Sequence, residues 1–249
     1  MLSPETRHRV SITPAMEDYL KTIYRLAESG QPATTQAIAE RLNVAAPSVT
    51  GMVKRLAELR LVDHERYRGV VLTAAGEKAA LEIVRHHRLL ELYLAEALGY
   101  SWDEVHDEAE RLEHTISEEF EARIDRALGY PTVDPHGDPI PSAAGAIHEL
   151  PGDRLIDLPT GECATVARVS DRDAEMLRYL ASLSVYPDTA VCVIERLPFD
   201  GPLRVRVGTG DQVHMFGAEL ARAIRVRRDV PPLLVDATTA TPSRPDGHA

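Results

Sequence analysis

The run from His106 to His114 reads H-D-E-A-E-R-L-E-H, and it narrows what this part of the chain can form. On a helix, side chains three or four positions apart are neighbours. A helix here would therefore stack His106, Glu110, Glu113 and His114 along one face. Two imidazoles and two carboxylates facing the same way suit a divalent cation, and without one the two glutamates repel each other. The spacing predicts a metal site, and the rest of the sequence has to indicate its purpose.

Length and composition limit the class of protein. The chain has 249 residues, which is enough for two or three domains. It has no uncharged run of about 18 apolar residues, so we expect no membrane span. The start, MLSPETRHRV, lacks the apolar core of a secretory signal, so we expect a cytoplasmic protein. Cys163 and Cys192, the two cysteines, fit a reducing compartment and are too few for a zinc finger.

The formal net charge of −11 is unevenly distributed. From Glu40 to Val70, six Lys/Arg against four acids give 6 − 4 = +2, whereas from Asp103 to Asp125 two Arg against ten acids give 2 − 10 = −8. Local fields decide where DNA or cations are attracted. A mildly basic first third and a strongly acidic middle are therefore compatible with DNA binding in one region and cation binding in the other.

The first third has the pattern of a helix-turn-helix. Thr13-Pro14 is typical of a helix start, and apolar residues then recur at helical spacing through Leu26. After a Gly-Gln-Pro break, Thr34 or Thr35 is expected to cap a short helix that ends at Leu42. A tight turn follows, and Pro47 begins a third helix. Two short helices across a four-residue turn indicate a helix-turn-helix.

Two strand-like runs, 61–65 and 70–73, flank the basic segment Arg66-Tyr67-Arg68-Gly69. A hairpin with a basic tip after a recognition helix predicts a winged helix, which binds double-stranded DNA. Taken singly, such residues most often form a solvated surface, but the ordered set favours DNA binding. The residues expected to contact bases or phosphates are Ala45, Pro47, Ser48, Thr50, Gly51, Lys54, Arg66 and Arg68.

Two longer helices are predicted in the middle third. The first runs from Thr73 to about Leu98, ends at Gly99, and places His87 and Glu91 on one face. The second starts at the capping box of Ser101 and Glu104, contains the His106–His114 run, and continues to about Leu128. Two long amphipathic helices after a winged helix are expected to pair with a twin, because DNA readers of this size usually bind paired half-sites as dimers.

Two other classes of protein fit the sequence less well. A carboxylate-bridged metalloenzyme of the ferritin-like type would carry Glu three residues before His, but those positions before His86, His87 and His114 are Ile83, Val84 and Arg111. An H-E-x-x-H motif is also absent from the sequence. A regulator that binds a small organic ligand would need a large apolar pocket, of which the sequence gives no sign. We therefore expect neither an enzyme nor a small organic substrate.

The last third is rich in short β-like runs, at 163–169, 190–195, 203–207, 212–216 and 224–227, with a short helix at 174–183. This pattern suggests a small SH3-like barrel. The predicted fold is thus a mainly α N-terminal part, a winged helix plus a helical dimerisation domain, followed by a small β domain. The expected divisions are 1–74 for DNA binding, 75–145 for dimerisation and metal binding, 146–160 for a linker, 161–232 for the SH3-like domain, and 233–249 for a disordered tail.

Five stretches occur in an order and at a spacing that are typical of one family: PAMEDYLKTIY (14–24), IAERLNVAAPSVT (38–50), HRLLE (87–91), EVHDEAERLEH (104–114) and DPHGDPIP (134–141). They span most of the first 145 residues. On them the chain resembles the metal-dependent repressors typified by the diphtheria toxin repressor and the manganese transport regulators. The resemblance implies a homodimer that binds palindromic operator DNA and represses metal-uptake genes.

The resemblance also implies two metal sites. The primary site would use Asp18, Glu110, Glu113 and His114, with His87 either joining it or serving its neighbour. The second site would use His87, Glu91 and His106, sometimes completed by an acid of the C-terminal domain. Asp171, Asp173 and Glu175 lie where that domain could donate such a ligand, and we name Asp173 as the candidate.

The identity of two ligands bears on which metal is bound. The iron-sensing branch of the family has Met at the position of Asp18 and Cys at that of Glu110. Both differences replace soft sulfur by hard oxygen, which favours Mn²⁺. Fe²⁺ remains the alternative, with Co²⁺ as a substitute in vitro. The manganese branch often carries a further Glu where this chain has Lys21.

Overall fold

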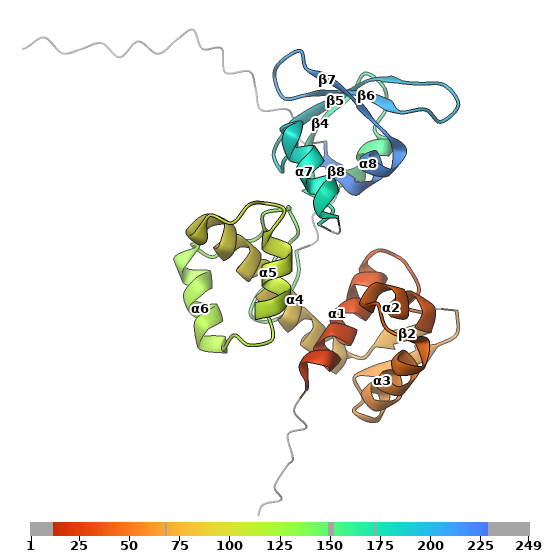
Figure 1. Cartoon of the computed structure of the whole chain (residues 1–249), viewed down its shortest axis with the longest axis vertical. Coiled ribbons are helices and arrows are strands. Elements are labelled where there is room, and N and C mark those ends of the chain that lie inside the picture. Colours follow the sequence, from red (N-terminus) through yellow and green to blue (C-terminus); the bar gives the residue numbers. More distant parts are fainter. Residues whose placement is uncertain (1–11, 68, 149–151, 172, 229–249) are drawn as a thin grey trace, which may run out of the picture. The chain divides into compact units, whose positions relative to one another are not determined.

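The structure, a computed structural model, describes residues 12–67, 69–148, 152–171 and 173–228. It divides into two compact units, residues 1–150 and 151–249 (Figure 1). The first is mainly helical and the second is built on a six-stranded sheet. The predicted fold class, helical first and β-rich after it, is confirmed.

The first unit begins with the predicted helix-turn-helix. Its elements are α1 (Pro14–Glu28), α2 (Thr35–Leu42), α3 (Ala46–Glu58), β1 (Val62–Glu65) and β2 (Gly69–Leu72). The Thr34 hydroxyl accepts a hydrogen bond from the Ala37 amide at 3.1 Å, which caps α2. Asn43 ends α2 in the left-handed conformation at φ 51°, a conformation that Asn tolerates better than most residues. The turn then leads into α3, with Pro47 in its first turn.

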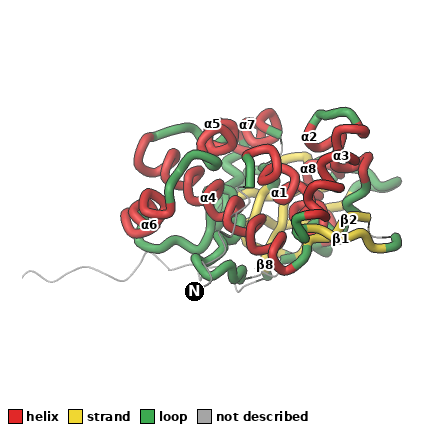
Figure 2. The backbone as a smooth tube through the Cα atoms, turned by 90° about the horizontal axis from the view of Figure 1, so that it is seen from below, coloured by secondary structure: helices red, strands yellow, loops and turns green. Residues whose placement is uncertain are grey.

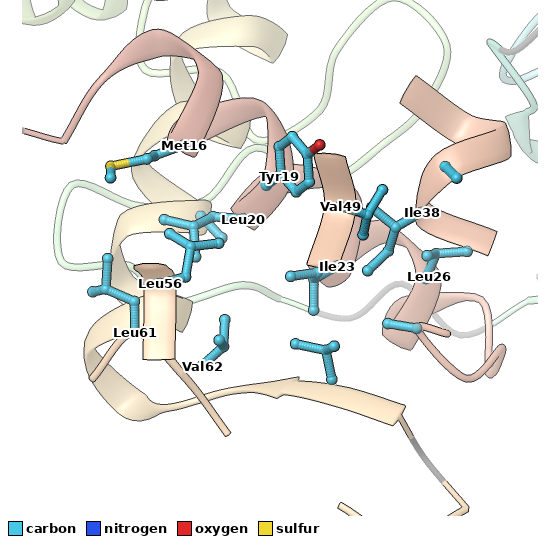
Figure 3. Packing of buried hydrophobic residues seen from close by; sticks show 14 residues of the cluster. Met16, Tyr19, Leu20, Ile23, Leu26, Ile38, Val49, Leu56, Leu61 and Val62 are labelled. Atoms are coloured by element: carbon cyan, nitrogen blue, oxygen red, sulfur yellow. The ribbon is translucent and has the colours of Figure 1, made fainter. Parts of the chain in front are cut away.

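Apolar side chains from all three helices form the core of this region. Leu20 and Ile23 of α1 meet Ile38 of α2 and Val49 and Leu56 of α3, all fully or almost fully buried (Figure 3). Removing a side chain of this size from water contributes about 1.5–3 kcal/mol. The buried stripe of α3 leaves its opposite face to solvent, so the predicted recognition surface is available for DNA.

The wing is a short antiparallel hairpin with Val62 opposite Leu72 and Glu65 opposite Gly69. Figure 2 shows it as a strand pair beside α3. The Val70 amide donates to the Ala33 carbonyl at 3.0 Å, so the wing is joined to the loop before α2. A Cβ on Gly69 would lie 2.6 Å from that carbonyl oxygen, and Gly69 has φ +77°. Only glycine fits such a position without strain.

The helices of the dimerisation region differ from the prediction in one place. The elements are α4 (Ala74–Leu98), α5 (Val105–Leu112) and α6 (Glu118–Ala127). Gly99 ends α4 as expected, in the left-handed conformation. The single helix predicted from Ser101 to about Leu128 is wrong, because the chain leaves helical geometry after Glu113 and starts again at Glu118.

The break in that helix has a local cause. The Ser117 hydroxyl accepts from the Phe120 amide at 3.2 Å and caps α6, and α6 has three glutamates in its first turn. A serine cap and acidic residues favour a new helix start. The predicted Ser101–Glu104 contact does form, with 2.5 Å between Ser101 Oγ and Glu104 Oε2, but α5 begins only after it. His114 therefore lies in a turn rather than on a helix.

The second unit is an antiparallel sheet with strand order β3-β8-β4-β5-β6-β7. Its elements are β3 (Asp153–Arg154), a 3-10 turn (Leu155–Asp157), β4 (Cys163–Val169), α7 (Ala174–Ser182), β5 (Ala190–Arg196), β6 (Leu203–Val207), β7 (Val213–Phe216), α8 (Ala218–Ala223) and β8 (Ile224–Arg227). All five predicted strands and the predicted helix are present.

The C-terminal region differs from the sequence prediction at its linker and its cysteines. The proposed linker differs from the structure, because β3 pairs with β8 and Leu155 and Leu158 are fully buried. Two paired residues are too few to give an alternating pattern in the sequence.

Cys163 and Cys192, expected as thiols, face each other across β4 and β5 and form a disulfide. The proposed disordered tail lies outside the described residues. Among the described residues, no helix has the length and apolarity of a membrane span.

Two glycines provide a test of the packing between the wing and α4. A Cβ on Gly76 would lie 1.9 Å from the Leu61 backbone oxygen, whereas a Cβ on Gly51 meets nothing within 4 Å. We expect Gly76→Ala to destabilise the protein by about 1–3 kcal/mol. The matched Gly51→Ala should be neutral or stabilising by up to about 1 kcal/mol, because alanine favours the helix. Thermal unfolding measures both, and equal melting temperatures for the two variants would contradict this packing.

Candidate metal centre

A group of charged side chains gathers where α1, α4 and the end of α5 meet. Helix α1 packs against α4, and α5 packs against α4 (Figure 1). The structure brings together all seven predicted ligands of the first unit: Asp18 from α1, His87 and Glu91 from α4, His106 and Glu110 from α5, and Glu113 and His114 from the turn after α5. Spacing indicated the candidates between His87 and His114, the family resemblance implied Asp18, and the packing of three helices brings them into contact.

The first cluster joins Asp18, Glu113 and His114. His114 Nε2 lies 2.8 Å from Asp18 Oδ1 and 3.5 Å from Glu113 Oε1. Each residue offers one ligand atom, and these atoms lie within 4.8 Å of one another. Burial raises the pKa of Asp18, an effect that the neighbouring His114 opposes. Two carboxylates and one imidazole are hard and borderline donors that fit a divalent cation.

Sequence reasoning missed Glu17. Its Oε2 atom lies 2.6 Å from His114 Nδ1, so His114 is held between two neighbouring acids of α1. A signal was available in the sequence, because Glu17 precedes Asp18 directly. Adjacent positions on a helix do not face the same way, so spacing along α1 gives no reason to group Glu17 with Asp18. The turn after α5 allows the two ring nitrogens of His114 to face both residues.

Lys21 of α1 lies beside the first cluster, in contact with Glu110, Glu113 and His87. Its Nζ atom donates to Glu110 Oε1 at 2.7 Å and to Glu113 Oε1 and Oε2 at 2.8 and 2.7 Å. Burial would raise the pKa of Glu110, but the Lys21 ammonium and His87 outweigh it and lower that pKa to about 2. Burial likewise opposes ionisation of Glu113, and His87 and Lys21 lower its pKa despite it. Both glutamates are therefore carboxylates at neutral pH.

The second cluster joins His87, Glu91 and His106. His87 Nε2 lies 2.9 Å from Glu91 Oε1 and 3.1 Å from His106 Nδ1, and His106 Nδ1 lies 3.0 Å from Glu91 Oε1. His87 also faces the first cluster, with Nδ1 2.6 Å from Glu113 Oε2. The resemblance left open which site His87 would serve. In the structure, one ring nitrogen faces each cluster.

The DPHGDPIP segment contributes residues to which the sequence analysis gave no role. His136 is fully buried, stacks on Trp102, and has Nδ1 3.8 Å from Glu91 Oε2. Asp134 lies close to His136 and Glu91. Burial raises the pKa of Asp134, and the neighbouring carboxylates of Asp138 and Glu91 raise it further. Glu91 Oε2 is buried and makes no hydrogen bond within the described part of the chain. A buried carboxylate oxygen of this kind favours a bound cation, which supports the second cluster as a cation site.

Asp173, the proposed ligand from the C-terminal domain, has a structural role of its own. Its Oδ1 atom accepts from the amides of Glu175 and Met176 at 2.8 and 3.2 Å, which caps α7. A capping aspartate is a common helix start. Its role as a metal ligand stays a prediction.

The predicted DNA-contacting residues share one property, which is exposure. Six of them lie at the start and on the outer face of α3, and one lies in the wing: Ala45, Pro47, Ser48, Thr50, Gly51, Lys54 and Arg66. Arg68 lies outside the described residues. Arg66 stacks over Tyr67, with its guanidinium carbon 4.9 Å from the ring centroid. The residues predicted to contact DNA on the exposed face of α3 are small or polar and include no acid, as a DNA-reading helix requires.

Comparison with known proteins identifies three domains in the chain. Residues 11–70 match "Iron dependent repressor, N-terminal DNA binding domain" and residues 73–142 match "Iron dependent repressor, metal binding and dimerisation domain". Residues 154–228 match the FeoA domain. The second match covers α4, α5 and α6 with the turn after α5, and so includes every candidate ligand of the first unit except Asp18.

Two named repressors are similar to most of this chain. The iron-dependent repressor IdeR of Mycobacterium tuberculosis is 34% identical over 224 residues, covering 85% of this chain and 96% of the relative. The diphtheria toxin repressor of Corynebacterium efficiens is 34% identical over 222 residues, covering 85% and 94%.

Solved structures agree in fold over nearly the same span. A manganese-dependent transcriptional repressor in complex with manganese superposes with a TM-score of 0.80 at 45% identity, covering 85% of this chain and 98% of that one. The manganese regulator SloR superposes at 0.73 and 32% identity, covering 88% and 100%. The resemblance stated from sequence is confirmed. The chain belongs to the iron-dependent repressor family of metal-dependent, DNA-binding transcriptional regulators, which are repressors and not enzymes, and it carries a C-terminal FeoA domain.

Proposed function

We propose that this chain is a Mn²⁺-activated repressor of metal-uptake genes, which acts in the cytoplasm and binds a palindromic operator as a homodimer. The observation that carries the proposal is the first cluster, where Asp18 of the DNA-binding domain meets Glu113 and His114 of the dimerisation domain. Each ligand set in the first unit consists of carboxylate oxygens and imidazole nitrogens. We therefore infer that the protein senses metal at this junction of the two domains.

The choice of manganese rests on ligand chemistry. Oxygen donors suit Mn²⁺, whereas thioether and thiolate donors suit softer ions. Asp18 and Glu110 supply oxygen at the two positions where the iron-sensing branch has sulfur. The manganese complex with 45% identity is in line with this choice, while the relatives named iron-dependent keep Fe²⁺ as the alternative for the same site.

The proposed mechanism is a shift between conformations. A bound divalent cation would supply positive charge shared by ligands of α1 and of the turn after α5. Asp18 lies on the helix whose other face holds Leu20 and Ile23 in the core beneath α3. Fixing α1 against α5 therefore fixes the recognition helix with respect to the dimerisation domain. A ligand shifts such an equilibrium only by its differential affinity, and a coupling of about 1–3 kcal/mol is typical.

The second cluster would add to this coupling. His87 and Glu91 are fully buried on α4, and His106 lies on α5. These residues hold α5 against α4, so a cation there would strengthen the platform that carries Glu110 and Glu113. His87 contacts both clusters. Occupancy of the second cluster would therefore favour the arrangement of the first.

Removal of metal gives the first test. A duplex selected from a random library in the presence of Mn²⁺ should bind the protein in Mn²⁺ and bind about tenfold or more weakly with excess chelator, given the usual coupling. Asp18→Asn should lose most of the Mn²⁺ dependence because it removes the ligand from α1. Asp107→Asn, on the exposed face of α5, is the matched control and should behave as wild type. Affinity that is unchanged by chelation, measured by fluorescence anisotropy, would refute activation by metal.

Replacement of one ligand tests the choice of metal. Asp18→Cys exchanges an oxygen donor of the first cluster for sulfur, and we expect DNA binding to be activated better by Fe²⁺ or Co²⁺ relative to Mn²⁺ than in wild type. An anaerobic titration with Mn²⁺, Fe²⁺, Co²⁺ and Zn²⁺ gives the ranking. Glu119→Cys adds the same thiol on exposed α6 and should leave the ranking unchanged. If Asp18→Cys also leaves it unchanged, the hard-ligand argument for manganese fails.

A further inference from the structure

Lys21 is a buried cation among metal-ligating groups. Its side chain is 5% exposed, and its Nζ atom has three short contacts with carboxylate oxygens, one to Glu110 and two to Glu113. His87 Nδ1 lies 3.2 Å from the same Nζ atom. An ammonium group has three protons to donate, and the two glutamates accept all three. Lys21 therefore has a complete set of partners, each of which is a candidate metal ligand.

The groups around Lys21 have the arrangement of a cation site. His87, Glu110 and Glu113 each offer a ligand atom, and these atoms lie within 4.8 Å of one another. A second trio, Asp18, Glu113 and His114, meets the same criterion. Glu113 belongs to both trios, and its two oxygens could bridge a pair of ions, which in two-metal sites lie about 3.5–4 Å apart. The geometry thus provides two adjacent cation positions, and the Lys21 ammonium lies in one of them.

Position on α1 explains how one helix serves both trios. Lys21 follows Asp18 by three residues, so both side chains leave α1 on the same side. Asp18 contacts His114, while Lys21 contacts Glu110 and Glu113. A buried ammonium that left its carboxylates would lose three charge-assisted hydrogen bonds, and Glu113, which is fully buried, would lose its nearest positive charge.

We propose that Lys21 is an internal counter-ion that occupies the His87/Glu110/Glu113 position and thereby limits the cluster around Glu113 to one divalent cation, held by Asp18, Glu113 and His114. The inference rests on the proposed metal-binding function of that cluster. Lys21 also neutralises one of its acidic charges, so a divalent ion binds less tightly beside it than it would beside a neutral side chain. At a separation of about 4 Å, the ammonium charge repels a bound cation strongly even at an effective dielectric constant of about 20.

Counting bound ions tests the proposal directly. The background is His106→Ala, which removes a ligand of the second cluster so that the first cluster dominates the count. In this background we expect one Mn²⁺ per chain by equilibrium dialysis, and two after Lys21→Glu, which replaces the ammonium by a further carboxylate. The pair of ions sharing Glu113 should give an exchange-coupled electron paramagnetic resonance spectrum. A single ion gives an uncoupled one.

Lys21→Met provides a second variant that adds no negative charge to the cluster. It should bind the first Mn²⁺ about tenfold or more tightly than the background, because a nearby positive charge is gone, and accept a second ion at higher concentration. In the metal-free protein it should melt at a lower temperature, because Glu110 and Glu113 lose their donor. Lys78→Met removes an exposed lysine of α4 and should keep one ion, the same affinity and the same melting temperature.

Two results would overturn the proposal: two ions in the first cluster while Lys21 is intact, or a single ion in both Lys21→Glu and Lys21→Met. If circular dichroism shows that Lys21→Glu does not fold, Lys21→Met decides alone. The count uses no DNA, so its failure is distinct from failure of the proposed function. A wrong count leaves activation by metal standing. Chelator-insensitive DNA binding would remove the regulatory function whatever the count.

Discussion

A fully buried carboxylate needs positive charge or hydrogen-bond donors close to it. Glu113 is such a carboxylate, and meeting its need involves several parts of the first unit. Its partners come from two different helices: Lys21 lies on α1 and His87 on α4, while Glu113 itself closes α5. Because α1 belongs to the DNA-binding domain and α4 and α5 to the dimerisation domain, compensating one charge requires the two domains to meet. The electrostatics of a single side chain thus links the arrangement of the domains to the binding of cations.

The same requirement explains how an acidic protein can be built to bind DNA. The acidic residues cluster in α5, the turn after it and α6, where Glu113 meets Lys21 and His87, and Glu121 meets Arg85 and His86. Helix α3 has no acid at its start and has Lys54 and Arg55 in its second half. Negative charge is therefore concentrated in the dimerisation domain, which holds the candidate cation clusters, and kept away from the face that approaches DNA phosphates. The net charge of the whole chain says little about either surface.

Local signals predicted much of this structure. Thr34 and Gly99 marked helix boundaries correctly because caps act over three or four residues. The break between α5 and α6 was missed because periodicity continues across it, and the competing cap at Ser117 was not recognised. The candidate ligands His106, Glu110, Glu113 and His114 were likewise visible as a spacing on one segment. The contacts of Lys21 and of Glu17 were not, because each depends on how α1 packs against α5, and a sequence pattern does not record that packing.

His87 shows what the packing adds. At 2.6 Å, the contact between its Nδ1 atom and the Glu113 carboxylate requires a proton between them, so Nδ1 is the donor. In the neutral imidazole the lone pair then belongs to Nε2, which faces Glu91 and His106 at 2.9 and 3.1 Å. A histidine that ligates a metal through one nitrogen commonly donates its other N–H to a carboxylate. With Lys21 in place, the contact with Glu113 would therefore orient His87 as a ligand for a cation in the second cluster. One imidazole couples the two clusters through the opposite ends of its ring.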